Sequence, residues 1–169
     1  MKPAFANELE RTLTGDSFAA PTSHILEGIE DALAHREFPH VPRSIYAELW
    51  HIVFWQQLSL DWVRGIPTPN PASAAAGFPS QTDIERESWS ELCVRFAHTS
   101  AEAAEIARDA AAFERAIRCP SPPGHPERTM TVREQLENLT AHNAYHFGRI
   151  VLMRQMPDSW PPPSGGFSW

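Results

Sequence analysis

A chain of 169 residues with 42% apolar and 21% charged residues has the size and composition of one compact domain, and we expect a single domain over residues 1–169. The net charge is −7, Lys2 is the only lysine, and the arginines are scattered among acidic residues, which argues against binding to nucleic acids or anionic membranes. No apolar run reaches membrane-spanning length, and residues 1–8 lack the layout of a signal peptide, so we expect a cytoplasmic protein.

The N-terminal third predicts two helical segments. The first covers about residues 5–14 and ends at Gly15, and the second covers about residues 22–36. In the second segment an apolar stripe repeats at helical spacing, formed by Ile25, Leu26, Ile29 and Leu33. Pro39 and Pro42 then interrupt the chain, and Pro42 can open the next helix, whose first turn does not need the missing N–H.

The next predicted helix, at about residues 43–64, is apolar almost all the way round. A helix without a polar face is buried on more than one side. We therefore expect it at the centre of the fold, covered also by a partner subunit or by the C-terminal tail. A homodimer with this helix at or near its two-fold interface follows as a prediction.

Residues 65–80 are rich in Pro, Gly, Ser and Ala and predict a loop. Thr82 and Glu85 then have the spacing of a capping box, and a bundle-like stripe follows them. Because an unbroken helix to Arg118 would be ~55 Å long, we expect a break near Asp109 and a short helix at 110–117.

Residues 120–126 predict a second loop, and Thr131 with Glu134 forms another capping box that opens the last long helix. The prolines of the 157–169 tail favour an extended run, and its two tryptophans, Trp160 and Trp169, suggest that it docks on the body. No alternation typical of strands competes with the helical patterns. We therefore predict an all-α four-helix bundle with a short extra N-terminal helix and an extended Pro-rich C-terminal tail.

Two histidines in the last helix, His142 and His146, are four residues apart and so project from the same helical face. His51 lies on the apolar 43–64 helix. A single histidine on an apolar face is usually a hydrogen-bonded core residue, but bundle interiors also build metal sites from facing helices. We therefore propose His51, His142 and His146 as ligands of one divalent metal ion.

The sequence around these histidines also carries a family resemblance. The run from His142 to Met153, an HxxxH followed by a small residue and an aliphatic stretch, resembles the C-terminal signature of the DinB/YfiT-like metal-binding four-helix bundles. The stretch that ends in His51 is similar to the second-helix motif of that family, and the proline-rich end is similar to the tail of one subgroup. The resemblance begins near Ser23, and residues 1–20 have no counterpart. It implies an up-down-down-up bundle, a divalent ion on the same three histidines, and often a homodimer.

Three neutral imidazoles leave at least one open coordination position, whereas structural zinc sites usually have four protein ligands. An open site supports a metal-dependent hydrolase, or alternatively an S-transferase that uses a low-molecular-weight thiol, as some relatives in the family do. A small-molecule substrate or thiol would then be the partner. The further alternative is a non-catalytic structural or stress-related bundle. Zinc, nickel, iron and copper all accept imidazole nitrogen, so the identity of the metal stays open.

The supporting residues are assigned less directly. Glu48 precedes His51 by three residues and could face the same cavity, but we expect a solvent-facing or capping carboxylate. Asn138 could orient His142, and Arg149 and Arg154 could lie near a thiol. Cys93 and Cys119 have no ligand spacing with the histidines and are expected to be reduced thiols.

Overall fold

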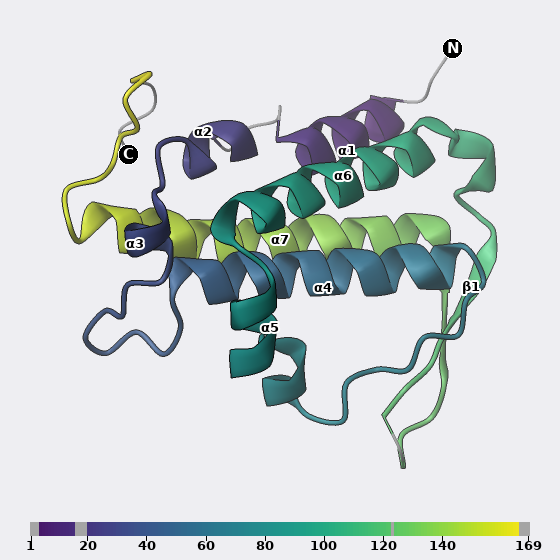
Figure 1. The fold of residues 1–169 in the computed structure, drawn as a ribbon. Helices are drawn as coiled ribbons and strands as arrows, with labels where there is room; N and C mark the ends of the chain where they lie inside the picture. The colour runs from purple at the N-terminus through teal and green to yellow at the C-terminus, as the bar shows by residue number, and fades with distance from the viewer. Residues whose placement is uncertain (1–3, 16–19, 123, 166–169) are drawn as a thin grey trace.

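The computed structural model describes residues 4–15, 20–122 and 124–165, and most of them are helical. The body is a bundle of α1 (Ala4–Thr14), α4 (Ile45–Val63), α6 (Trp89–Arg108) and α7 (Val132–Gln155). Figure 1 shows α4 and α6 running in one direction and α1 and α7 in the other, which is the up-down-down-up order. The prediction of an all-α helix bundle is confirmed.

The N-terminal helix α1 is part of the bundle, so the prediction of a short extra helix beside four others is wrong. Ala6, Leu9 and Leu13 of α1 are buried in the core, and the helix packs on α6 and α7. The four helices of the bundle include it.

The predicted 22–36 helix is instead divided into α2 (Thr22–Leu26) and α3 (Asp31–Ala34). Gly28 has a φ of +67°, in the left-handed region, and this conformation stops helix propagation. The two short helices cover one end of the bundle, where Ile25 and Ala34 are buried.

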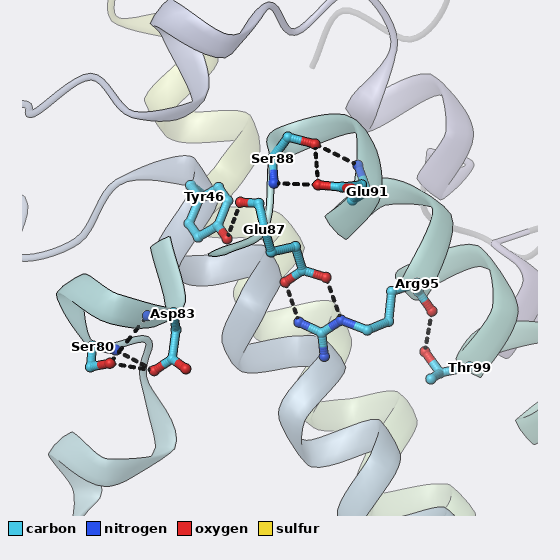
Figure 2. A network of polar contacts seen from close by, with 8 residues as sticks. All are labelled: Tyr46, Ser80, Asp83, Glu87, Ser88, Glu91, Arg95 and Thr99. Carbon is cyan, nitrogen blue, oxygen red and sulfur yellow. Dashed lines mark hydrogen bonds and ion pairs between the residues drawn. The ribbon is translucent and has the colours of Figure 1, made fainter. Parts of the chain in front are cut away.

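Because α4 and α6 run in parallel, residues 64–88 must return the chain along the length of the bundle. This crossover contains the 3₁₀ helix η1 (Ala74–Gly77) and the short helix α5 (Gln81–Arg86). The predicted start at Thr82 is wrong, because Ser80 and Asp83 form the capping box of α5. A second capping box, from Ser88 and Glu91, opens α6 (Figure 2).

The break between α5 and α6 lies at Glu87, and this residue connects the crossover to the bundle. Its carbonyl accepts a hydrogen bond of 2.9 Å from the hydroxyl of Tyr46 on α4, and its carboxylate pairs with Arg95 at 2.6 Å (Figure 2). The break predicted near Asp109 is confirmed, since α6 ends at Arg108.

A two-stranded antiparallel hairpin, β1 (Ala116–Cys119) and β2 (Arg128–Thr131), follows the 3₁₀ helix η2 (Ala110–Ala112). The expected short helix at 110–117 and the expected absence of strands are therefore wrong. Ile117 and Cys119 alternate inward along β1, and β2 leads directly into Thr131, the cap of α7. The capping box of Thr131 and Glu134 is present as predicted.

Helix α4 is central, as its composition predicts, and within it Gln57 alone is exposed. Buried hydrogen bonds connect it to its neighbours, from Gln56 to Ser100 on α6 and from Gln135 on α7 to Ser59. Most of the covering of α4 thus comes from this chain. The tail contributes elsewhere: Ser164 bonds to Glu27 beside α2, while Trp169 lies outside the described residues.

None of the helices in the described part of the chain is both long and apolar enough to cross a membrane.

Candidate metal centre

The three predicted ligands come together between the middle of α4 and the middle of α7. His51, His142 and His146 each offer a ring nitrogen, and these nitrogens lie within 4.8 Å of one another. Nε2 of His51 and Nε2 of His142 are 3.1 Å apart. A tetrahedral zinc ion with bonds of about 2.05 Å holds its nitrogen ligands about 3.3 Å apart, so the spacing of this pair suits a shared ion.

The ring of His51 is held from both its edge and its face. Nδ1 donates to the carbonyl oxygen of Gly77 at 2.6 Å, which leaves the lone pair on Nε2, the atom that faces His142. Phe78 stacks on the ring with centroids 4.0 Å apart, and the guanidinium carbon of Arg43 lies 4.6 Å from the centroid of Phe78. The close approach favours glycine at position 77, where a Cβ would lie 3.4 Å from Cε1 of His51.

His146 is oriented by Glu48. Nδ1 of His146 lies 2.5 Å from one carboxylate oxygen, and Nε of Arg149 donates to the other at 2.8 Å. Burial raises the pKa of Glu48, but the hydrogen bond from His146 and the charge of Arg149 outweigh it and lower that pKa overall. Glu48 is fully buried, so the expectation of a solvent-facing or capping carboxylate is wrong.

A carboxylate bonded to the outer nitrogen of a histidine fixes its tautomer and directs the other nitrogen towards a metal. The structure gives this arrangement to His146 through Glu48, and a backbone carbonyl does the same for His51. The sequence left a cavity-facing Glu48 as the less favoured alternative and did not identify this role. A carboxylate three residues before a candidate ligand, on a helix with no polar face, was the available signal.

Among the described residues, neither a carboxylate nor a backbone carbonyl accepts a hydrogen bond from the outer nitrogen of His142. Its Nδ1 is buried without a hydrogen-bond partner, and the ring itself is half-buried. The proposed orienting residue Asn138 is exposed, and its amide nitrogen lies 3.9 Å from the sulfur of Met130. The prediction that Asn138 holds His142 is therefore wrong.

The electrostatic state of the rings suits a cation. Burial lowers the pKa of His51, and it lowers the pKa of His142 to about 4. Both rings are neutral near pH 7 and keep a lone pair for a metal. A direct imidazole–imidazole hydrogen bond accounts for the contact of His51 with His142, but it does not involve His146, which offers a ring nitrogen to the same cluster.

A cleft of about 290 Å³ reaches the site at His142. Its walls come from α4, α7, the crossover and the hairpin, and Cys119 and Arg128 line it from the two strands. Arg149 is paired with Glu48, and Arg154 is buried against Ile25 and Ser159, so neither predicted cation lines this cleft. Cys93 and Cys119 are free thiols that stand apart from the histidine cluster, as expected.

A comparison with protein families identifies the family of this chain. The family model of the DinB superfamily matches residues 18–150, which include all three histidines and Glu48. No curated protein sequence matches the chain.

Proposed function

Because the chain belongs to the DinB superfamily, we propose that His51, His142 and His146 bind one divalent metal ion and that the protein is a metal-dependent hydrolase. The observation that carries the proposal is the convergence of the three ring nitrogens within 4.8 Å, beside a cleft that reaches one of them.

The number of ligands favours a reactive site over a structural one. In the described part of the chain, no fourth histidine, cysteine or carboxylate joins the cluster. Both oxygens of Glu48 are used, by His146 and by Arg149. Three neutral ligands do not complete a tetrahedral shell and leave a position for an exchangeable molecule.

When bound, a divalent ion of this kind lowers the pKa of a coordinated water towards neutrality and polarises a carbonyl group. The protein's part is to hold the ligands and to control access. Gly77 and Phe78 fix the ring of His51, and Glu48 fixes the ring of His146. His51 and His146 are buried and His142 is half-buried, so the proposed approach of a substrate is through the cleft at His142.

The alternative activity is thiol-dependent group transfer, because the same open position accepts a thiolate. The cleft volume, near the lower end for ligand pockets, favours a small thiol over an extended one in that case.

Two assays separate these activities. Zinc-loaded protein is expected to hydrolyse small esters or amides faster than the metal-free His142→Ala variant, and equal rates would contradict the hydrolase. A thiolate charge-transfer band on cobalt-substituted protein, together with thiol-dependent turnover, would favour the transferase. A fully saturated metal that accepts neither water nor thiol would favour the non-catalytic alternative.

A further inference from the structure

We propose that the cleft beside His142 is the substrate site, and that Arg128 binds a carboxylate group of a small substrate whose reacting bond lies at the histidines. This inference rests on the metal site proposed above and adds to it the chemical class of the substrate.

The unexpected hairpin gives the cleft its charged wall. Cys119 and Arg128 are register partners across β1 and β2, and both line the cleft with His142. One short cleft therefore reaches from the histidine cluster to a guanidinium group on the hairpin.

Arg128 is the charged side chain among the residues that line the cleft. In the described part of the chain, Arg128 forms no ion pair. Its Nη2 lies 3.4 Å from the sulfur of Met130, a weak contact for a guanidinium. Arg118, on the neighbouring strand, differs in this respect because it pairs with Glu127 at 2.6 Å. The cleft thus offers a positive charge with its hydrogen-bonding capacity largely unused.

Two further sets of polar groups line the cleft, besides Asn70, whose amide donates to the carbonyl of Pro120. Gln135 and Ser59 are buried and bonded to each other at 2.8 Å, and the thiol of Cys119 lies 3.9 Å from the amide oxygen of Gln135. The hydrogen-bonding groups of these residues are thus paired with one another and are not available to a ligand. Asn138 is exposed and makes only a long contact with Met130, so it is available to a ligand beside Arg128.

The charge balance selects a carboxylate over a phosphate. A single guanidinium matches one negative charge, and its planar fork pairs with a carboxylate through two parallel hydrogen bonds. Among the described residues that line the cleft, Arg128 is the one cationic side chain, and the net charge of −7 disfavours a doubly charged ligand beside it. The substrate class that follows is a small carboxylic acid carrying the ester or amide bond to be cleaved.

Thiols that bind the metal directly test this subsite without measuring turnover. Cobalt-substituted protein is titrated with mercaptoacetate, mercaptopropionate and mercaptobutyrate, and with the neutral mercaptoethanol, mercaptopropanol and mercaptobutanol of matching length. The charge-transfer band gives each dissociation constant. The proteins compared are the wild type, Arg128→Gln, Arg128→Lys, and Arg86→Gln, which removes the same charge from α5 outside the cleft.

At one chain length or more, the wild type and Arg86→Gln are expected to bind the carboxylate about five- to tenfold more tightly than the matched alcohol. Arg128→Gln should lose this preference, and Arg128→Lys should keep part of it. The proposal would be overturned if the wild type showed no preference for the carboxylate over the alcohol at any chain length, or if Arg128→Gln kept that preference. Either result would leave the metal site intact. If no thiol of either class produced a band, the open coordination position itself would be refuted.

Discussion

One carboxylate oxygen of Glu48 lies 2.5 Å from Nδ1 of His146, and both groups are buried. The two residues belong to different helices, 98 positions apart in the chain. Their contact fixes the rotation of the His146 ring and therefore the direction of its free nitrogen. The geometry of the histidine cluster thus depends on a residue outside the cluster.

Replacing Glu48 with Gln is expected to weaken metal binding by about 10- to 100-fold, as loss of such an outer partner typically does. The amide keeps the shape but removes the charge that orders His146 and Arg149. Competition with a chromogenic chelator measures the affinity. The control is Glu137→Gln, an exposed carboxylate of α7, the helix that carries His146. Equal affinity in the two variants would remove Glu48 from the site.

Arg154 is expected to act in stability, because it is 1% exposed and donates to the carbonyls of Ile25 and Ser159. Arg154→Met leaves these acceptors without a partner and should lower the free energy of unfolding by about 1–3 kcal/mol. Urea denaturation measures the change, with the exposed Arg86→Met as control. A loss no greater than that of the control would show that the tail does not depend on this arginine.

The pH dependence of stability should include a contribution from Glu134, the capping carboxylate of α7. Its hydrogen bonds to the amide and hydroxyl of Thr131 lower the pKa of Glu134 below the ordinary 4.5. The folded state therefore holds the proton less tightly than the unfolded state. The stabilisation is present above about pH 4.5 and is lost as the pH falls through the lowered folded value.

Glu134→Gln should accordingly be less stable than the wild type at pH 7, and the difference should shrink as the pH falls from 4.5 towards 2. Chemical denaturation across this range measures it. Glu137→Gln removes the same charge from α7 without touching the cap and should not show this convergence. A constant difference between Glu134→Gln and the wild type would contradict the assignment.

The homodimer remains a prediction. The sequence predicts it from the apolar circumference of the 43–64 helix. Other parts of the same chain cover most of that circumference. We propose that the remaining part, where the half-buried rings of Trp50 and Phe54 stack 5.5 Å apart, lies at the interface. Light scattering should give twice 19.0 kDa, and Trp50→Gln should weaken the pairing. A single-chain mass for the wild type across micromolar concentrations would refute the dimer.

The features that the sequence predicted are those with a strong local signal. Helix α7 carries a capping box at Thr131 and Glu134, and α4 is apolar almost all the way round, so the sequence predicts the start of each helix to within two residues. His142 and His146 share a face because of helical geometry alone, which made their pairing visible without a structure.

The features that it missed depend on competing local signals or on distant contacts. Ser80 and Thr82 are both followed three residues later by an acid, and the alternative starting at Ser80 is the one that forms. The strands of the hairpin have four residues each, too few for alternation to stand out. The carbonyl of Gly77 reaches His51 from a crossover 26 residues away, and no spacing rule predicts such a contact.

The central claim, that His51, His142 and His146 bind one metal ion, is tested most directly by elemental analysis of purified protein. The wild type should contain about one equivalent of a divalent transition metal per chain, and His51→Ala, His142→Ala and His146→Ala should each lose it. His98→Ala, which changes an exposed histidine of α6, should retain it. A wild type that remains metal-free after incubation with zinc, nickel and iron, or a His146→Ala variant with unchanged metal content, would contradict the account.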